Sequence, residues 1–427
     1  MNGHGHAQPL HVWIVEIGET MPVIDGTARY MRCGILSRTL VDRGHTVTWW
    51  SSTFDHARKR QRVDRSGTFE IQPGLEARLL FSRDYRSNGS LKRFLSQRGT
   101  AASFAREADS GPRPDLIFCS LPTPELAEES ALLGRKYDVP VIIDVNDQWP
   151  DSYLLAFPSW LRPLVRPMLH GEFRRIARAL GAATSITAVS ETYLKWALGY
   201  AGRSRRETDA VFPLGYWVPP PSDGEAPHAD VQAKYAIRPD AFVALFVGTF
   251  GASYDLETVV KVAAALNAQE TKDVQFLLVG DGDQKSRLHQ MAAGLDNLTF
   301  TGWVDGGELN GLLRLASVGL ASYTADCYQS LPYKPFEYMA GGLPLLSSLR
   351  GELEALIRTE RIGLHYEPGD VTALTEGIRW LAANPLTRRE MGDRARALFD
   401  EHFSADVVYP KLVQHIENVA GSHHARM

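Results

Sequence analysis

Short apolar runs separated by longer amphipathic stretches mark the first half of the chain. Apolar runs of four to eight residues bounded by turn residues are typical of buried strands. We predict such strands at residues 11–18, 45–50, 115–120, 140–144 and 185–189. A helical stretch at residues 28–43 ends at Gly44, and Ser190 opens another helix after the last of these strands. Strands that alternate with helices indicate a parallel sheet.

The same pattern restarts in the second half of the chain after an interruption. Three prolines at residues 219–221 and a polar run at 222–230 are typical of a linker. Beyond it we predict strands at residues 241–248, 274–280, 298–301 and 318–322. The helices predicted between them span residues 256–266, 284–293 and 308–316, and residues 387–417 are predicted to be mostly helical.

These elements predict an α/β fold of two Rossmann-like, doubly wound domains that face each other across a cleft. We place the first domain at residues 1–213 and the second at 214–386. A helical segment at 387–427 is expected to pack back toward the first domain. Open α/β sheets bind ligands beyond the carboxyl ends of their strands. Each domain is therefore expected to hold one substrate at the cleft.

The composition is typical of a cytoplasmic globular protein. Of the 427 residues, 44% are hydrophobic and 22% are charged, and no apolar run approaches the roughly 18 residues of a membrane-spanning helix. The first residues lack the basic and apolar regions of a secretory signal. Cys33, Cys119 and Cys327 are far apart and have no metal-ligand spacing.

Charge is distributed unevenly between the two halves. Residues 1–213 carry 28 basic and 23 acidic side chains, a net charge of +5, whereas residues 214–427 carry 18 and 27, a net charge of −9. A basic first half favours an anionic partner there, such as a phospholipid surface or a substrate that bears phosphate. Ordinary variation of surface charge is the alternative.

The segment SLPYKPFEYMAGGLP at residues 330–344 combines a helix start with a helix stop. Pro335 is typical of a first helical position, where its missing N–H costs nothing, and residues 336–340 would continue that helix. Gly341 and Gly342 would end it before a strand at residues 343–347. We therefore predict a short helix whose N-terminus points toward the cleft.

Lys334 stands immediately before this predicted helix, where the helix macrodipole disfavours a positive side chain. A bound phosphate would remove the conflict, because the lysine and the helix N-terminus both attract an anion. Glu337 has two interpretations. It is either a residue of the first turn that favours the dipole or closes a capping box, or an acceptor for ribose hydroxyls.

This segment resembles the signature of glycosyltransferase family 4, retaining enzymes of the GT-B architecture that share the pattern L-P-x-K-x-F-E-Y-x-A-x-G-L-P. Weaker similarity to the same family extends over nearly the whole chain, at residues 25–26, 43–45, 144–151, 188–190, 248–256, 279–282 and 300–304. The resemblance implies that the first domain binds the acceptor and the second binds a nucleotide sugar.

The resemblance also implies a role for each matching residue. Asp147 would face the acceptor or the sugar, Lys334 would hold the diphosphate and Glu337 the ribose, and these three form the implied catalytic group. The implied donor contacts come from Gly26, Gly251, Gly280, Val304, Gln329, Ser330, Leu331, Lys334, Phe336 and Glu337.

The sequence departs from the family pattern at two places. The family commonly has two glutamates eight residues apart, and Gln329 occupies the first of these positions. Many relatives carry Arg and Lys in the first loop of the second domain, whereas residues 251–255 (GASYD) contain neither. More of the phosphate binding is therefore expected of Lys334 and the helix N-terminus.

The reaction implied by the resemblance is retaining transfer of a hexose, from a UDP-sugar rather than a GDP-sugar, to a glycan or lipid-linked diphosphate acceptor in bacterial-type polysaccharide or glycoconjugate biosynthesis. Retention usually needs two carboxylates, and no such pair is evident. The implied alternative is front-face attack, in which the leaving diphosphate takes the acceptor proton while Lys334 and oriented amides stabilise its charge.

No metal or other cofactor is expected, and no nucleic acid partner. The run Asp281-Gly282-Asp283 resembles a metal motif only superficially, and His45 is interpreted as structural. Two other functions stay open: a nucleotide-sugar epimerase on the same fold, and a non-catalytic nucleotide-sugar-binding protein, for which Gln329 is the motive. An epimerase needs acid–base carboxylates and histidines in the cleft, and the signature segment argues against one.

Residues 161–180 are predicted to form an amphipathic basic helix. Basic residues recur there every four positions, at Arg162, Arg166, His170, Arg174 and Arg178. Apolar residues interleave them, at Leu161, Val165, Leu169, Phe173 and Ile176. Such a helix is typical of a membrane surface, although Pro163 and Pro167 would break or kink its first turns. We predict peripheral contact with the anionic inner face of a membrane, and the alternative is a solvated helix face.

Overall fold

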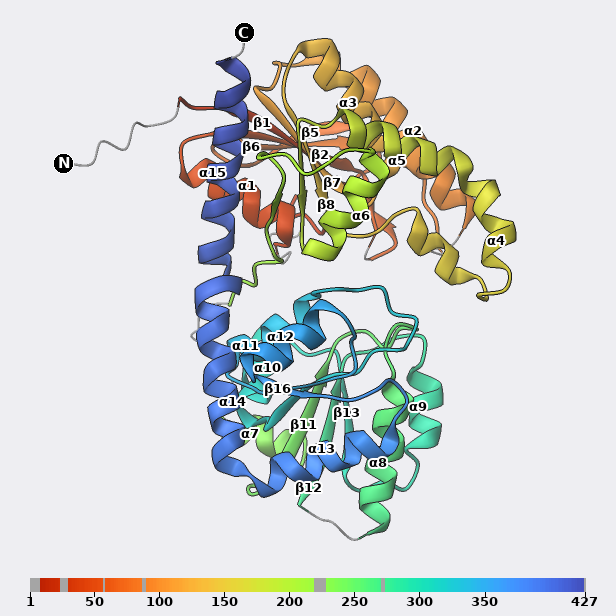
Figure 1. Cartoon of the computed structure of the whole chain (residues 1–427), viewed down its shortest axis with the longest axis vertical. Helices are drawn as coiled ribbons and strands as arrows, with labels where there is room; N and C mark the ends of the chain where they lie inside the picture. The colour runs from red at the N-terminus through yellow and green to blue at the C-terminus, as the bar shows by residue number, and fades with distance from the viewer. Residues whose placement is uncertain are drawn as a thin grey trace, which may run out of the picture. The chain divides into compact units, whose positions relative to one another are not determined.

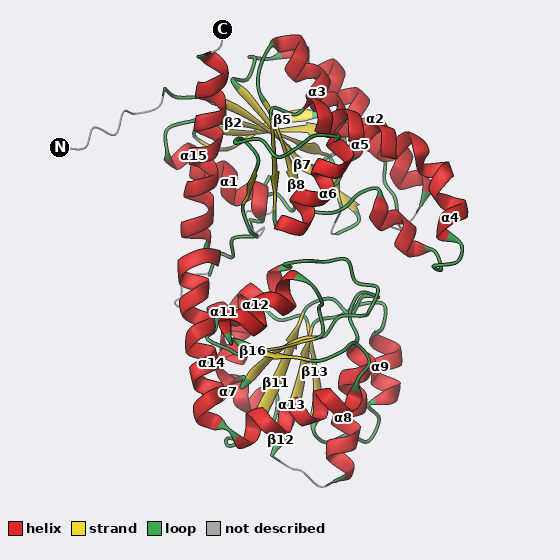
Figure 2. Ribbon diagram, in the orientation of Figure 1, coloured by secondary structure: helices red, strands yellow, loops and turns green. Residues whose placement is uncertain are grey.

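The computed structural model describes residues 8–23, 30–56, 58–86, 90–218, 228–269 and 273–425, which belong to two compact units. Unit 1 comprises residues 1–213 and 408–427, and unit 2 comprises residues 214–407. Both units are built on largely parallel sheets flanked by helices (Figures 1 and 2), so the predicted α/β class is confirmed. None of the helices within the described ranges has the length and apolarity that crossing a bilayer requires.

The sheet of unit 1 has the strand order β10-β9-β8-β7-β1-β2-β6-β5, in which only the edge strand β5 is antiparallel to its neighbour. Its strands are β1 (His11–Val15), β2 (Thr46–Ser52), β5 (Gly67–Gln72), β6 (Leu75–Leu80), β7 (Leu116–Leu121), β8 (Val141–Val145), β9 (Ser185–Ala188) and β10 (Ala210–Val211). A separate antiparallel hairpin consists of β3 (Phe54–Asp55) and β4 (Arg60–Gln61).

The helices of unit 1 are α1 (Arg32–Asp42), α2 (Leu91–Glu107), α3 (Pro124–Tyr137), α4 (Arg162–Val165), α5 (His170–Ala182) and α6 (Glu191–Ala201). Short 3-10 turns cover Ala108–Ser110, Asp151–Ala156 and Arg166–Leu169. Figure 1 shows α2, α3 and α5 together on one side of the sheet. As predicted, Ser190 opens α6: its side chain accepts a hydrogen bond from the backbone N–H of Tyr193 at 3.2 Å.

The single helix predicted for residues 161–180 is wrong. The segment forms α4, the 3-10 turn Arg166–Leu169 and then α5. Each proline lies in the first turn of its element, where no backbone N–H partner is lost. The prolines therefore break the segment, which is one of the two outcomes expected of them.

A buried ion pair ties α1 to the middle of the sheet. The Arg32 guanidinium donates from Nε to Asp144 Oδ2 at 2.7 Å and from a terminal nitrogen to Oδ1 at 2.9 Å, and both side chains are almost completely buried. Asp144 also accepts from the Thr187 hydroxyl at 2.7 Å, and Arg32 donates to the Pro213 carbonyl at 3.0 Å. Removing one partner of such a pair would leave an uncompensated buried charge.

The last helix, α15 (Ala405–His424), contributes residues to unit 1 from the far end of the chain. His45 is buried, accepts from the backbone N–H of Leu10 at 3.1 Å through Nδ1, and contacts Glu417 Oε1 at 3.0 Å through Nε2. Glu417 also pairs with Arg43 at 3.1 Å. His45 thus links the start of the chain to its last helix.

The sheet of unit 2 has the order β13-β12-β11-β14-β15-β16 and is parallel throughout. Its strands are β11 (Phe242–Val247), β12 (Val274–Val279), β13 (Leu298–Gly302), β14 (Val318–Ala321), β15 (Leu345–Ser347) and β16 (Gly363–His365). Its helices are α7 (His228–Lys234), α8 (Leu256–Ala268), α9 (Lys285–Met291), α10 (Gly306–Leu315), α11 (Tyr333–Ala340), α12 (Glu352–Glu360), α13 (Val371–Ala383) and α14 (Pro385–Leu398), followed by a π-helical turn at Phe399–Phe403.

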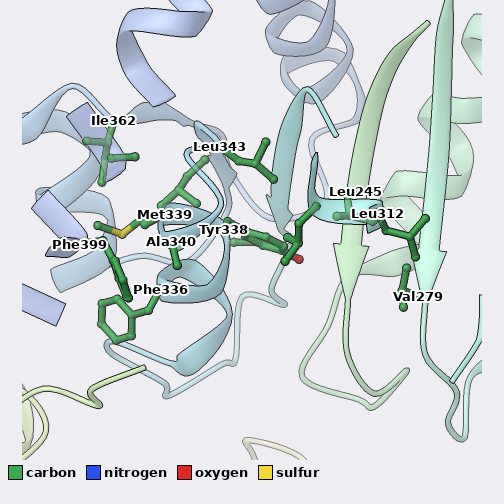
Figure 3. Packing of buried hydrophobic residues seen from close by; sticks show 14 of the residues in the cluster. Leu245, Val279, Leu312, Phe336, Tyr338, Met339, Ala340, Leu343, Ile362 and Phe399 are labelled. Carbon is green, nitrogen blue, oxygen red and sulfur yellow. The ribbon is translucent and has the colours of Figure 1, made fainter. Parts of the chain in front are cut away.

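The core of unit 2 has two halves, one on each face of its sheet. Alternate residues of β11 point to opposite faces, so that Leu245 packs with the core that contains α11 and Phe246 with the core that contains α8 and α13. Figure 3 shows the first of these cores, in which Phe336 and Met339 of α11 lie toward Phe399.

Helix α11 is held against the sheet by Tyr338. Its hydroxyl accepts from the backbone N–H of Val247 at 2.9 Å and donates to the Leu320 carbonyl at 3.2 Å. A Cβ atom at Gly319 of β14 would overlap the Tyr338 ring, so only glycine permits this close packing. The two contacts fix α11 relative to β11 and β14.

Candidate functional site

Three loops converge at the carboxyl edge of the unit 2 sheet, where β11, β12 and β13 end. Gly248 donates its N–H to the Val279 carbonyl at 2.8 Å, and Gly280 donates to the Gly302 carbonyl at 2.9 Å. A Cβ atom at Gly280 would overlap the carbonyl of Gly248. Both glycines have positive φ angles, +142° at Gly248 and +130° at Gly280. The edge therefore presents bare backbone, which a ligand can approach closely.

Helix α11 begins earlier than predicted at this edge. It spans Tyr333–Ala340 with Pro332 as its N-cap, so Pro335 is its third residue and not its first. The prediction was wrong because no N–H in the first turn has an intrahelical partner, and proline is therefore tolerated anywhere in that turn. Lys334 consequently lies inside the first turn, against the helix macrodipole, and not before it.

The Lys334 ammonium lies among aromatic rings. Its Nζ is 3.7 Å from the ring centroid of Tyr254 and 5.2 Å from that of Phe246. A Cβ atom at Gly248 would overlap Cε and Nζ of Lys334, so any other residue at 248 would force the end of the lysine side chain to move. Burial lowers the pKa of Lys334 to about 8, although the negative charges of Glu337 and Cys327 oppose this shift.

No carboxylate forms an ion pair with Lys334 within the part of the chain that the structure describes. A partly desolvated cation of this kind is costly without an anion. Ser330, two residues before the N-cap, is buried, and its hydroxyl has no hydrogen-bond partner among the described residues. The lysine, this hydroxyl and the first N–H groups of α11 suit an anion with several oxygen atoms, such as a phosphate.

Glu337 lies in the second turn of α11 and not in the first, so the capping interpretation is wrong. The Tyr216 hydroxyl donates to Glu337 Oε1 at 2.9 Å, and both side chains are buried. Tyr216 is itself anchored, because its N–H donates to the Phe403 carbonyl at 2.9 Å. No sequence signal marks Tyr216, since it lies 121 residues from its partner.

The other predicted donor residues of unit 2 lie in two places, one in the loops after β11 and β13 and the other around the start of α11. Gly251 lies in the loop after β11, where its carbonyl accepts from the Gln284 side chain at 2.5 Å. Val304 is half-buried and follows Gly302, which bridges to Gly280.

The remaining donor residues lie around the start of α11. Gln329 is exposed and Leu331 is half-buried. The Phe336 ring is completely buried and stacks on Phe403 at 4.5 Å between ring centroids. The side chain of Phe336 is therefore part of the core, and its N–H lies one residue beyond the unpaired N–H groups of the first turn of α11.

Two predicted residues belong to unit 1. Gly26 lies outside the described residues. Asp147 follows β8 and accepts from its neighbour Gln148 N at 2.7 Å and from Trp149 Nε1 at 3.0 Å. Burial raises the pKa of Asp147, while these hydrogen bonds oppose the shift. The Asp147 carboxylate is thus held in one orientation at the carboxyl edge of the unit 1 sheet.

The acidic run at residues 281–283 makes local contacts. Asp281 accepts from the N–H of Gly282 at 2.7 Å and pairs with Lys285 at 2.6 Å. The pairing with Lys285 lowers the pKa of Asp281. Within the described residues, no three side chains of His, Cys, Asp or Glu are grouped so that they could hold a metal ion.

Two family models match most of the chain. The model described as "Glycosyltransferase Family 4" matches residues 25–211, and the model described as "Glycosyl transferases group 1" matches residues 229–398. The two matches fall in unit 1 and unit 2 respectively.

A curated relative is the lipopolysaccharide core biosynthesis glycosyltransferase LpsE of Rhizobium meliloti, 24% identical over 186 residues. The match covers 43% of this chain and 52% of LpsE, so the chain spans about half the length of this relative. A sucrose-phosphate synthase from Thermosynechococcus elongatus is similar in structure over 96% of this chain and 99% of its own, with a TM-score of 0.74 at 19% identity. Anabaena HepE in complex with UDP and glucose covers 96% of this chain and 100% of its own, with a TM-score of 0.67 at 15% identity.

The pKa of Lys334 predicts how affinity for UDP, the nucleotide of the donor that the sequence resemblance implies, depends on pH. The lysine attracts a diphosphate only when it is protonated. Because its pKa is about 8, its charged fraction falls from about 0.9 at pH 7 to about 0.1 at pH 9. We expect UDP affinity, measured by calorimetry, to fall by about tenfold over this range. Lys334→Met should weaken binding at pH 7 and remove most of the pH dependence. An equal pH dependence in the variant would assign the effect to another group.

The contact between Gly248 and Lys334 predicts the effect of a single methyl group. Gly248→Ala should displace the ammonium and lower UDP affinity by about tenfold or more, the scale of a lost charged hydrogen bond. Gly294→Ala is the matched control, because Gly294 also has a positive φ of +81° but has open space around its Cβ position. Both variants should lose some stability on heating. Equal UDP affinities would contradict the proposed role of this contact.

Proposed function

Because this chain belongs to glycosyltransferase family 4, with the GT-B architecture, we propose that it transfers a hexose from a nucleotide sugar to a glycan or lipid-linked acceptor in polysaccharide or glycoconjugate biosynthesis. The similarity to LpsE, which is named for lipopolysaccharide core biosynthesis, supports this class of product.

The observation that carries the proposal is the position of Lys334. Its ammonium lies at the start of α11 beside Gly248, on the carboxyl edge of a parallel sheet, where nucleotides bind in this class of fold. The N-terminus of α11, the Lys334 ammonium and the bare glycine backbone at this edge would all favour the diphosphate of a nucleotide sugar.

Glu337 would accept hydrogen bonds from the ribose hydroxyls. One of its carboxylate oxygens receives the Tyr216 hydroxyl, which holds the side chain in place. Tyr216 is accordingly a positioning residue. A UDP-sugar is the preferred donor, and the similarity to HepE in complex with UDP and glucose supports it.

The proposed reaction retains the configuration of the sugar. The bond from the anomeric carbon to the diphosphate oxygen breaks, and a bond from that carbon to the acceptor oxygen forms on the same face. The departing diphosphate takes the acceptor proton. Lys334 and the first N–H groups of α11 would stabilise the negative charge that develops on the diphosphate, without a metal ion, and Asp147 would orient the acceptor.

A panel of UDP- and GDP-sugars tests this function directly. We expect release of UDP from one UDP-hexose, stimulated by an acceptor glycan, and an α-linked product by NMR. An epimerase would instead interconvert two nucleotide sugars without releasing nucleotide. Binding of UDP-sugars with no release and no interconversion would indicate a non-catalytic protein and contradict the proposal.

Variants of Glu337 and Tyr216 separate binding of the donor from folding. Glu337→Gln should raise the donor KM about tenfold or more, because hydrogen bonds to a charged acceptor are strong. Tyr216→Phe keeps the ring and should raise the donor KM by less, with kcat nearly unchanged. Unaltered donor KM in both variants, with the fold intact by circular dichroism, would limit Glu337 to a structural role.

We further propose that unit 1 contacts an anionic membrane through α4 and the 3-10 turn after it. The apolar side chains exposed there are Trp160, Leu164 and Met168, with 74%, 68% and 82% of their surface accessible. Of the predicted apolar row, Leu161, Val165, Leu169 and Phe173 are only half-exposed and Ile176 is buried.

Ion pairs reduce the number of basic groups that this surface offers to lipid. Arg175 pairs with Glu128 at 2.7 Å, and Arg178 also pairs with Glu128. Arg166 pairs with Asp151 at 3.1 Å but stays exposed. The exposed apolar side chains therefore carry most of the proposed contact, and the arginines add attraction to anionic headgroups.

Co-sedimentation with vesicles tests the membrane contact. The double variant Leu164→Glu and Met168→Glu should lose most binding to vesicles of phosphatidylglycerol and phosphatidylcholine, because it places two carboxylates in the apolar surface. Leu386→Glu is the control, since Leu386 is 78% exposed but lies in the first turn of a helix of unit 2. Wild-type binding without any dependence on phosphatidylglycerol would refute the proposal.

A further inference from the structure

A second cluster of cations lies in unit 1, on side chains with no role in donor binding. Lys59 belongs to the β3–β4 hairpin, and its Nζ is 3.4 Å from His56 Nδ1 and 4.9 Å from the ring centroid of Tyr85. His56 Nδ1 is 2.5 Å from the Tyr85 hydroxyl. Arg93, from the first turn of α2, also hydrogen-bonds Tyr85. Two separate elements thus bring a lysine, a histidine and an arginine to one tyrosine.

This cluster adjoins Asp147, the residue proposed to orient the acceptor. The Arg93 guanidinium lies 4.3 Å from the ring centroid of Trp149. The indole N–H of Trp149 donates to Asp147 at 3.0 Å. The positive charge of Arg93 opposes the rise in the pKa of Asp147 that burial causes. Arg93 is therefore linked to Asp147 through Trp149 and lies close enough to act on its charge.

The start of α2 carries positive charge where a helix disfavours it. Lys92 and Arg93 lie in its first turn, which has no acidic residue, and Ser90 caps the helix by accepting from the Arg93 N–H at 3.3 Å. At the other end, Arg106 lies in the last turn, where the macrodipole favours a cation. An anion at the start of α2 would be attracted by both the helix and the two basic side chains.

Burial and two nearby cations disfavour protonation of His56. Burial, together with the charges of Arg93 and Lys59, lowers the pKa of His56 to about 4. Burial and Arg93 also lower the pKa of Lys59. The nearby carboxylate of Asp55 raises the pKa of both groups but does not cancel these shifts. At neutral pH the imidazole is therefore an uncharged hydrogen-bonding group between two cations.

The other side of the hairpin adds more positive charge. Arg58, Arg60 and Arg62 line a cavity of about 140 Å³ together with Asp55. Asp55 accepts from the Arg58 backbone N–H at 3.0 Å and lies 3.7 Å from the Arg62 guanidinium. Among the described residues that line this cavity, three are arginines and one is a carboxylate, and Glu16 adds a further negative charge near Arg62.

We propose that Lys59, Arg93 and His56 form a binding site for a phosphate group carried by the acceptor. Arginine donates in a planar fork that matches phosphate oxygens, and lysine adds a compact charge. A neutral acceptor would gain nothing from these charges. The proposal rests on the proposed function, because it takes unit 1 as the side of the acceptor.

The binding test uses the full chain with Lys334→Met, so that phosphate does not report on the donor site. Titration with inorganic phosphate in low salt should give saturable binding, and Arg93→Gln or Lys59→Gln should weaken it about tenfold or more. Arg106→Gln removes the same charge from the opposite end of α2 and should leave it unchanged. Arg93→Lys should restore part of the affinity.

Two further measurements distinguish a lost site from a misfolded protein and phosphate from other anions. The NMR titration of His56, assigned with His56→Gln, should shift to higher pH when phosphate binds, because the anion offsets the nearby cations. Acetate should bind much more weakly than phosphate, and equally tight acetate binding would overturn the assignment to phosphate. Phosphate affinity that is unaltered in both Arg93→Gln and Lys59→Gln would overturn the site itself.

The kinetic test separates this inference from the proposed function. Arg93→Gln should raise KM for a phosphorylated acceptor about tenfold, and it should leave KM for the nucleotide sugar unchanged. The dephosphorylated acceptor should show no difference between wild type and variant. If the chain transferred no sugar at all, the phosphate titration would still decide whether the site exists.

Discussion

The chemistry proposed for this protein depends on a lysine ammonium that is drawn out of water and that forms no ion pair with a carboxylate among the residues the structure describes. Lys334 lies against the rings of Tyr254 and Phe246 in space that a side chain at residue 248 would occupy. Its helix is in turn fixed to the sheet through Tyr338, which needs a glycine at position 319. Two glycines and a tyrosine thus place one charge where an anion is required to offset it.

The two units use the same electrostatic device at different helices. Lys334 in α11 and Arg93 in α2 both lie in a first turn, against the macrodipole, and both are next to an aromatic ring. An aromatic face stabilises a cation without neutralising it, so each site keeps its attraction for an anion. A protein that joins two phosphate-bearing molecules would need two such places, one for each substrate.

Much of the architecture could be predicted from the sequence, because parallel strands are buried on both faces and appear as short apolar runs. The start of α11 could not, since proline is acceptable throughout a first turn and Pro335 did not identify the first residue. The partners of Glu337 and Lys334 escaped prediction as well. Tyr216 and Gly248 are distant in sequence, and only the folded chain brings them together. The pairing of Arg175 and Arg178 with Glu128 likewise depends on the packing of α3 against α5.

The contact between His45 and Glu417 has a consequence for biosynthesis. The two residues are separated by 372 positions, and all of unit 2 is encoded between them. A chain emerging from the ribosome can complete unit 2 while unit 1 still lacks part of its last helix. Residues 408–425 therefore act as a closing segment, and a nascent chain halted before them would leave His45 and the apolar surface beneath α15 open to water and to chaperones.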